Sequence, residues 1–449
     1  MSRFLILISI AFIGGCASSY QRMEPVRTYL YQHQYQKAVE VFDSLNISEQ
    51  NAVSLDHANR GLLLHLNKDY IESNAELEIA ETYMDRIREE NLKQIISSML
   101  INEYSLPYAG EDYENTMINF YKLFNYVLLN DFQEALVECR RIDHKLNVLY
   151  DFYSENLTYR EDGFARYLAG IIYEHLGHYD DAFIEYFKSY HIYKDLYYPN
   201  YNLSPPQGLI LSLIKTAVVT SRTDQIQDLL SNPRYQSIQT YIQTFQDSLN
   251  HSPVDSACEI IYILETGELP HKQEINVYLD IDDDHPQPVA LSLPTIIPHP
   301  SAITSGYLNS GNNQAPLELV ENLGAIAALS LEDHRGRIIV RAAARTGLKI
   351  LASEAGEFIG DQIADEENSW LGDLIGSAVS IFGAATEHAD LRSWSLLPDR
   401  IFLGRLAISP DQTNFTVNLH LYGYSDIELT YSIDPKPGEK IFIKERVWY

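Results

Sequence analysis

The stretch from Gly170 to Tyr186 reads Gly-Ile-Ile-Tyr-Glu-His-Leu-Gly-His-Tyr-Asp-Asp-Ala-Phe-Ile-Glu-Tyr, and its spacing predicts two helices joined by a tight turn. Tyr179, Ala182 and Tyr186 stand at offsets of zero, three and seven, which place them on one face of a helix. Gly177-His178 interrupts the pattern and marks the turn. The small side chain of Ala182 would let the two helices approach closely.

The same spacing occurs three more times in the N-terminal half. The four units centre on Tyr35, Tyr70, Phe132 and Tyr179, and each aromatic residue follows a predicted turn, at His33-Gln34, Lys68-Asp69, Asn130-Asp131 and Gly177-His178. A fifth helical pair is expected at Leu209 to Val219 and Gln225 to Leu230. The pattern predicts a helical solenoid over about residues 20 to 250, because hairpins of this kind stack on their neighbours to bury a core.

These units resemble the tetratricopeptide repeat, in which the concave surface of the solenoid usually binds partner peptides. In the best copy, the residues that the resemblance places on this surface are Phe164, Tyr167, Ile171, Glu174 and His175. They are mostly apolar. Two interpretations stay open: a groove for a protein partner, or a groove filled by the protein's own chain.

The first sixteen residues predict secretion and a lipid anchor. Arg3 precedes an apolar run from Phe4 to Phe12, and Ile13-Gly14-Gly15-Cys16 follows. This order is typical of a signal peptide, and the run is too short to span a membrane. The segment resembles a bacterial lipobox, which implies cleavage after residue 15, lipidation of Cys16 with palmitate-type chains, and a protein held at the membrane by lipid alone. Ala17 after the cysteine implies the outer membrane, facing the periplasm.

The C-terminal half, residues 251–449, changes to a strand pattern. Strands are expected at Cys258 to Leu264, Glu274 to Ile281, Val289 to Ile297, Ile401 to Leu406, Phe415 to Leu421, Ile427 to Ile433 and Lys440 to Val447. They predict an antiparallel sheet or sandwich. Three helices are expected in an insert rich in Ala and Gly at about residues 317–388, over 317–331, 336–364 and 370–388. The whole chain is therefore predicted to be an α+β protein.

The second insert helix carries a basic stripe. Arg337, Arg341, Arg345 and Lys349 recur every four residues, so they lie on one helix face. The stripe could contact an anion, such as a lipid phosphate, or it could pair with the chain's own acidic surface. The small residues of the insert allow close helix packing, either in a soluble hairpin or in a membrane-associated oligomer.

Two distinctive segments are Tyr108 to Glu114 and Ala389 to Ile401, which includes Asp390-Leu391-Arg392-Ser393-Trp394. With the lipobox and the repeats, they resemble a group of uncharacterised bacterial lipoproteins that have degenerate tetratricopeptide-like helices and a C-terminal β-rich part. The resemblance implies architecture and no activity. We expect Asp390, Arg392 and Trp394 to form a structural corner, in which an Asp–Arg pair caps a helix and Trp packs beneath it; the alternative is a ligand site.

Composition and missing motifs limit the function. The 449 residues hold 33 Lys and Arg against 62 Asp and Glu, a net charge of −29, which argues against a nucleic-acid partner. Cys139 and Cys258 are expected to be buried free thiols, and the alternative is a disulfide between them. Neither a nucleophile elbow, a zinc-protease motif nor a phosphate loop is present, so no catalytic residue, metal or cofactor is predicted.

The leading hypothesis is a lipid-anchored, non-enzymatic envelope protein whose repeats bind other envelope proteins. The alternatives are an enzyme or accessory acting on cell-wall glycan, and an oligomeric membrane-associated assembly.

Overall fold

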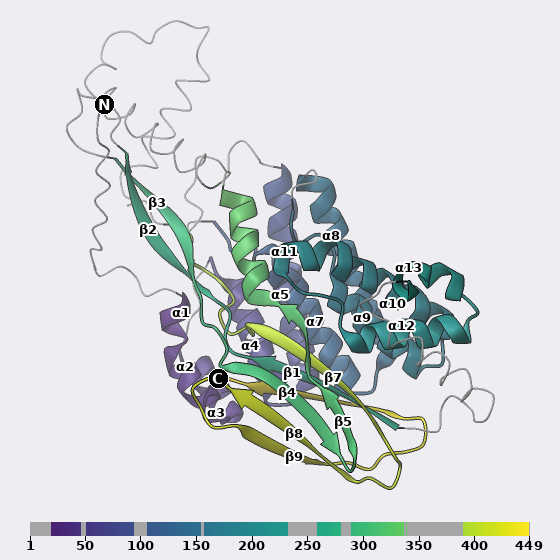
Figure 1. Ribbon diagram of the computed structural model, residues 1–449. Coiled ribbons are helices and arrows are strands. Elements are labelled where there is room, and N and C mark those ends of the chain that lie inside the picture. The colour runs from purple at the N-terminus through teal and green to yellow at the C-terminus, as the bar shows by residue number, and fades with distance from the viewer. Residues whose placement is uncertain are drawn as a thin grey trace, which may run out of the picture.

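The computed structural model describes residues 19–45, 51–93, 106–153, 157–231, 258–279, 289–335, 338 and 389–448 (Figure 1). The predictions for Cys16, for the stripe from Arg337 to Lys349 and for the later insert helices concern residues outside these ranges, as does the predicted boundary near residue 250. The described part contains an N-terminal set of helices and a C-terminal set of strands, so the α+β prediction is confirmed.

The helices of the repeat region form successive hairpins. In chain order they are α1 (Ser19–Arg22), α2 (Glu24–Leu30), α3 (Tyr35–Ser44), α4 (Val53–Leu66), α5 (Tyr70–Lys93), α7 (Asp112–Leu128), α8 (Phe132–Tyr153), α9 (Gly163–His175), α10 (Tyr179–Ile192), the π-helical turn η2 (Tyr193–Tyr197), α11 (Tyr198–Tyr201), α12 (Gln207–Val219), η3 (Thr223–Ile226) and α13 (Gln227–Leu230). The four predicted central aromatic residues are the first residues of α3, α5, α8 and α10.

All four predicted turns share one backbone geometry. The residues at the first turn position have positive φ angles, and they are His33 (55°), Lys68 (70°), Asn130 (60°) and Gly177 (75°). The next residue donates its N–H to the carbonyl five positions earlier, as His178 does to Tyr173 at 2.9 Å. This pattern closes the end of the first helix in each hairpin. Ser221 (59°) shows the same turn after α12, which confirms the fifth hairpin.

Small residues set the distance between paired helices. A Cβ atom added at Gly170 would lie 2.4 Å from the ring of Tyr186, and one added at Gly61 would lie 2.7 Å from the side chain of Leu77. Ser73 stands where the other units have Ala, and its Oγ donates to the carbonyl of Gly61 at 2.7 Å. The hydroxyl is thus accommodated because it finds a partner inside the hairpin.

The strands build two four-stranded sheets and a separate ribbon. They are β1 (Cys258–Thr266), β2 (His271–Leu279), β3 (Val289–Ile297), β4 (Ile303–Ser310), β5 (Asn313–Pro316), β6 (Glu318–Asn322), β7 (Arg400–Ile408), β8 (Asn414–Leu421), β9 (Ile427–Ser432) and β10 (Lys440–Val447). The first sheet has the order β10-β1-β7-β6, the second has β5-β4-β8-β9, and β2 pairs with β3 alone. Only β1 and β10 pair in parallel among the described strands.

The first sheet is the middle of three layers (Figure 1). Along β1, Ile261 and Ile263 belong to the core shared with the helices, whereas Ile260, Tyr262 and Leu264 belong to the core shared with the second sheet. Both faces are covered, so β1 is apolar on both sides, and the alternation of a strand sorts its residues between two cores.

Two sequence predictions in this half need correction. The segment 317–331 was expected to be one helix, but its first part is β6, and the helix occupies 323–335. Pairing of β6 with β7 outweighs the local helical spacing. Strands β4 and β5 were not predicted, because Thr-Ser-Gly and Asn-Asn-Gln give little apolar alternation. Cys139 and Cys258 are free and buried, as expected.

Candidate functional site

Glu174 and His175, two of the five predicted concave-surface residues, contact the protein's own sheet, whereas Phe164 packs on Phe120 of α7. Phe164, Tyr167 and Ile171 are fully buried, Glu174 is 4% exposed and His175 is half-buried. The rings of His175 and Phe442, on β10, lie 6.0 Å apart. In this structure the groove is filled by the chain's own C-terminal half, the second of the two interpretations given above. Whether these five residues also bind a partner stays an untested prediction.

Polar contacts fix the sheet against the helices along its length. On the η2 side, the hydroxyl of Tyr193 donates to the carbonyl of Val320 at 2.7 Å. At β10, the Nζ of Lys444 lies 2.9 Å from Nε2 of His65. Burial, followed by the nearby Lys444, lowers the pKa of His65 to about 3, so this imidazole is neutral at pH 7.

The two distinctive sequence segments meet at this junction. The carboxylate of Glu114 accepts from the backbone N–H of Trp394 at 2.7 Å and from the hydroxyl of Tyr108 at 2.5 Å. Arg392 forms an ion pair with Asp390 at 2.7 Å and lies over the ring of Tyr108. The Asp390–Arg392 pair and the buried Trp394 agree with the expected corner, although they cap no helix among the described residues, and the contact of Glu114 with Trp394 joins parts of the chain that are 280 residues apart.

An open cleft remains where the last repeats meet the edge of the sheets. Its volume is about 580 Å³. The lining comes from the end of α9, the start of α10, α12, β1, β5, β6, β7 and the start of β10. Its residues are Glu174, His175, Gly177, Tyr179, Gln207, Gly208, Leu211, Ser212, Lys215, Cys258, Glu259, Gln314, Ala315, Pro316, Glu318, Arg405, Ala407, Gly438 and Lys440. This volume falls in the range of about 300–1,000 Å³ typical of ligand sites.

Arg405 organises the charges at the cleft. Its Nε and Nη2 atoms donate to the two carboxylate oxygens of Glu259 at 2.7 and 2.8 Å. Nη2 also lies 3.2 Å from Oε2 of Glu174, and Nη1 donates to Oγ of Ser212 at 2.5 Å. The hydroxyl of Tyr186 donates to Glu174 at 2.6 Å. One guanidinium therefore joins a strand, two helices and both carboxylates.

Two lysines complete the charge cluster. The Nζ of Lys215 donates to Oε1 of Glu174 at 2.7 Å. The Nζ of Lys440 lies 3.4 Å from the same oxygen and donates to Glu259. Glu318, on β6, accepts from the backbone N–H groups of Gln207 and Gly208 at 2.5 and 2.8 Å and so satisfies the start of α12. We call Glu174, Lys215, Glu259, Arg405 and Lys440 the cleft cluster.

The cleft cluster holds its carboxylates ionised. Burial alone would raise the pKa of Glu174, but Arg405, Lys440 and Lys215 hold it well below its usual range. For Glu259, burial also acts upward, and Arg405 and Lys440 bring the pKa down to about 2. A carboxylate that must donate a proton in glycoside hydrolysis needs a raised pKa. The pair is therefore suited to electrostatic binding rather than to general acid catalysis.

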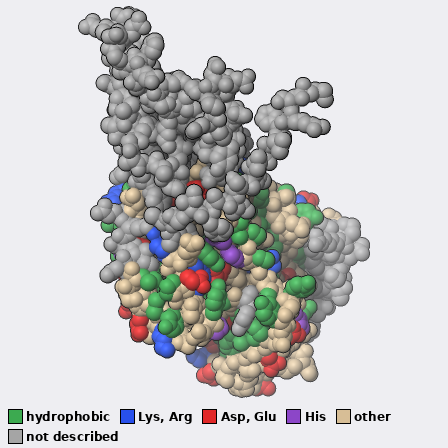
Figure 2. Space-filling model, turned by 90° about the vertical axis from the view of Figure 1, so that its left-hand side faces the viewer, with side chains coloured by type: hydrophobic (Ala, Val, Ile, Leu, Met, Phe, Trp, Pro, Cys, Tyr) green, Lys and Arg blue, Asp and Glu red, His purple; other side chains and the backbone are tan. Residues whose placement is uncertain are grey.

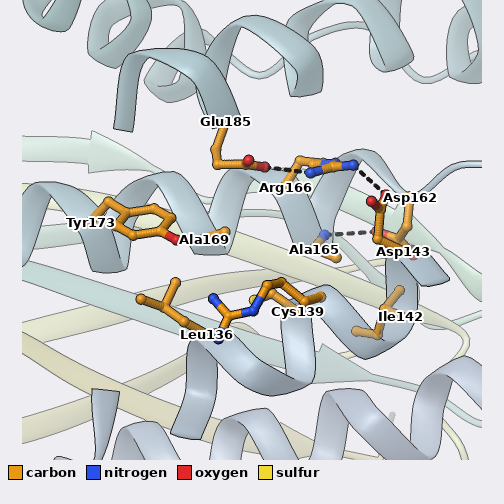
Figure 3. Close-up of a pocket in the computed structure, with 11 residues that line it drawn as sticks. Leu136, Cys139, Ile142, Asp143, Asp162, Ala165, Arg166, Ala169, Tyr173 and Glu185 are labelled. Carbon is orange, nitrogen blue, oxygen red and sulfur yellow. Dashed lines mark hydrogen bonds and ion pairs between the residues drawn. The ribbon is translucent and has the colours of Figure 1, made fainter. Parts of the chain in front are cut away.

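A second cavity is too small to bind more than a water molecule. It lies between α8 and the α9–α10 hairpin and has a volume of about 30 Å³ (Figure 3). Arg166 crosses it, bound to Glu185 at 2.8 Å and to Asp143. Cys139 lines the same cavity, and burial, followed by Glu185, raises the pKa of its thiol well above the usual range. This thiol stays protonated, and we assign it no chemistry.

Within the described ranges, no group of three or more His, Cys, Asp or Glu side chains is arranged to hold a metal ion. None of the helices described there is both long and apolar enough to cross a bilayer.

Comparisons with known proteins give little beyond a distant likeness. No family model matches the chain, and no curated protein does. Two crystal structures of the nearly identical TPR-like repeats of a putative kinesin light chain from Podosopora anserina are similar to it at 14% and 13% identity. They cover 52% of this chain and 96% and 97% of their own, each with a TM-score of 0.29. The description of the helices as repeats therefore rests on their own turns and spacing.

Sequence reasoning overlooked most of the cleft cluster. Glu259 and Arg405 each interrupt a run of apolar strand residues, Cys-Glu-Ile-Ile-Tyr and Leu-Gly-Arg-Leu-Ala. A charged residue inside a buried strand requires a partner of opposite charge, so these two interruptions are the sequence signal that indicates a buried ion pair. Which residues would join the pair depends on how the sheet packs against α9 and α12.

Proposed function

We propose that the protein is a lipid-anchored envelope scaffold that binds a protein partner in the cleft between its last repeats and its sheets. The observation that carries this proposal is the closed concave surface beside an open, charged cleft. A repeat protein whose groove is filled must contact partners elsewhere, and the cleft is a hollow lined by both halves of the chain. The envelope location rests on the lipobox resemblance around Cys16.

The structure near the N-terminus is compatible with a short tether. The ring of Tyr20 stacks on those of His271 and His299, with centroids 4.2 and 5.3 Å apart. The guanidinium of Arg27 lies 3.7 Å from the centroid of the same ring and is paired with Glu268 at 2.8 Å. The chain is thus fixed four residues after Cys16, and four residues reach at most about 14 Å.

A lipid on Cys16 would then turn one face of the molecule toward the membrane. This face carries α1 and the base of the β2–β3 ribbon, and Figure 2 shows it with hydrophobic groups and charges of both signs interspersed. The cleft lies at the other end of the sheet. Trp448, just after β10, contacts Tyr31 near α2, whereas Lys440 at the start of β10 belongs to the cleft. Eight residue steps separate these points, which is about 26 Å along an extended chain. The cleft would face away from the membrane.

The proposal is tested in two independent steps. Substitution Cys16→Ser should move the protein from the membrane fraction to the soluble fraction, and mass spectrometry of the wild type should show acyl chains on Cys16. An intact signal sequence at the N-terminus of the membrane-bound protein would contradict the lipid anchor.

Partner binding is tested at the cleft wall. Ala407 is exposed and lines the cleft, so Ala407→Trp should fill part of it and reduce recovery of crosslinked envelope partners at least tenfold. Thr430→Trp, at an exposed position of β9 outside the cleft, is the matched control. Equal recovery with both variants would contradict binding in the cleft. Tyr167 and Glu174 are unsuitable for this test because both are buried and their loss would also destabilise the fold.

A further inference from the structure

We propose that the outer face of the second sheet, built from β5, β4, β8 and β9, binds an uncharged polysaccharide chain. This sheet is the layer farthest from the helices (Figure 1), and the inference goes beyond the proposed function. Its inner face packs on the first sheet through Leu308, Val417 and Leu419, which are fully buried. The residues between them point to solvent, because side chains alternate along a strand and an antiparallel sheet can be solvated on one face.

Three amides and a carboxylate form a hydrogen-bonded row across all four strands. Nε2 of Gln314 on β5 donates to Oδ1 of Asn309 on β4 at 2.9 Å. Nδ2 of Asn309 donates to Oδ1 of Asn418 on β8 at 2.7 Å. Nδ2 of Asn418 donates to Glu428 on β9 at 2.8 Å. Asn309 and Asn418 are each held at both oxygen and nitrogen, so the planes of their amides are fixed before a ligand binds.

The amide row leaves both donors and acceptors for a ligand. A side-chain amide has two N–H bonds and two oxygen lone pairs. Among the described residues, Asn309 uses one N–H bond and one lone pair, and its side chain is half-buried on the solvent side. The other N–H bond and lone pair can reach a ligand. Sugar hydroxyls both donate and accept, so a chain of sugars complements such a row, whereas an anion can only accept.

Exposed tyrosines flank the amide row on the same face. Tyr307 lies opposite Asn418 in the register of β4 and β8, and its ring centroid lies 6.2 Å from that of His420. Tyr422 continues the alternation of β8 beyond His420, since its N–H donates to the carbonyl of Ala302 at 2.8 Å. Tyr307 is 37% and Tyr422 is 82% exposed. The C–H groups of a sugar ring pack on such aromatic rings, while the tyrosine hydroxyl stays in water.

The face carries little charge, which selects an uncharged ligand. Residues 303–316 and 414–432 include neither Lys nor Arg, and Asp426 and Glu428 are their only acidic residues, although 21% of the chain is charged. Asp426 pairs with His420 at 2.8 Å. A nucleic acid or an acidic polysaccharide would find no Lys or Arg on these strands. Protein interfaces have an apolar centre, whereas the centre of this face is the amide row.

Isothermal titration calorimetry of the full chain tests the proposal. The protein is kept in lauryldimethylamine oxide, because this detergent has no sugar headgroup. The probes are two uncharged hexasaccharides, hexa-N-acetylchitohexaose and cellohexaose, and the acidic hexagalacturonate. We expect saturable binding of at least one uncharged hexasaccharide and at least tenfold weaker binding of hexagalacturonate.

Two substitutions on the face locate the binding. Tyr307→Ala removes a ring, and Asn309→Ala removes two hydrogen bonds of the amide row. Each should weaken binding of the uncharged hexasaccharide at least tenfold, and both side chains lie on the solvated face, so the fold should persist. Tyr198→Ala is the matched control, because Tyr198 is a 51% exposed tyrosine on α11, in the helical layer.

Three results would overturn the proposal: no binding of either uncharged hexasaccharide, equal binding of hexagalacturonate, or unchanged affinity in both Tyr307→Ala and Asn309→Ala. None of them bears on the protein partner, which the Ala407→Trp variant tests at the cleft wall. Thr430→Trp stays a valid control for the cleft, because a polysaccharide on this face leaves the recovery of protein partners unchanged.

Discussion

Replacing Arg405 by methionine should destabilise the protein strongly, because it leaves the buried carboxylate of Glu174 and the partly buried carboxylate of Glu259 with fewer partners. The variant loses both hydrogen bonds to Glu259, the contact with Glu174 and the one with Ser212. Breaking a buried ion pair from one side typically costs about 3–5 kcal/mol. Because Lys215 and Lys440 continue to contact Glu174, we expect a loss at the lower end of this range, about 3 kcal/mol in the free energy of unfolding at pH 7.

The loss in Arg405→Met should depend on pH. The folded-state pKa of Glu259 is about 2, below the value of about 4.3 for an unperturbed Glu. A lowered pKa contributes stability above the unfolded pKa, and this contribution disappears as pH falls through the folded pKa. The difference between wild type and variant should therefore shrink between about pH 4 and pH 2.

Urea unfolding followed by circular dichroism at pH 7 and pH 3 measures both effects. Arg222→Met is the matched control: Arg222 pairs at 2.7 Å with Asp180, which is 70% exposed, and such a pair contributes less than about 1 kcal/mol. A loss below about 1 kcal/mol for Arg405→Met at pH 7, or a loss that does not shrink at pH 3, would refute the reasoning.

Three further substitutions test other parts of the fold. Gly170→Ala should lower the free energy of unfolding by about 1–3 kcal/mol, because the new Cβ meets the ring of Tyr186 at 2.4 Å; a stability equal to wild type in urea titration would show that the helices can separate freely. Glu114→Ala should cost about 1–3 kcal/mol, since the buried N–H of Trp394 loses its acceptor, and no change in thermal unfolding would contradict the role of this junction. Burial, followed by the nearby Asp162, raises the pKa of Glu321 well above its usual range, so ionisation of this group lowers the free energy of unfolding as pH rises above about 4.3. Glu321→Gln should therefore flatten the fall in stability between pH 5 and pH 8. A pH profile of stability equal to that of the wild type would contradict this role of Glu321.

The hairpins could be predicted from the sequence because their signals are local. The turn residues His33, Lys68, Asn130 and Gly177 adopt left-handed backbone angles at the predicted positions, and the aromatic residue that follows each turn begins a helix. Every element of this pattern lies within about twenty residues. Spacing of small and aromatic side chains is therefore enough to place each turn and the start of the helix after it, but not the ends of α5 at Lys93 and α8 at Tyr153.

The candidate site could not be predicted because its members come from distant parts of the chain. Arg405 and Glu174 are 231 positions apart, and they meet only because the sheet packs against the repeats. The same packing explains why Tyr167 faces the chain's own C-terminal half. The repeat pattern was enough to assign Tyr167 to the concave surface. Whether that surface is covered depends on strands β1, β7 and β10, and the packing of these strands against the helices leaves no periodic signal in the sequence. The sequence does not predict strand β6 for a related reason, since its partner β7 lies about 80 residues later.

Site-specific photocrosslinking in the native envelope tests the central claim most directly. A photoreactive residue placed at Gln314, which is exposed on the cleft wall, should form a covalent adduct with a partner protein, whereas one at the exposed Thr430 should not. Adding Ala407→Trp to the Gln314 probe should remove the adduct. No adduct from Gln314, or an equal one from Thr430, would contradict a partner-binding cleft.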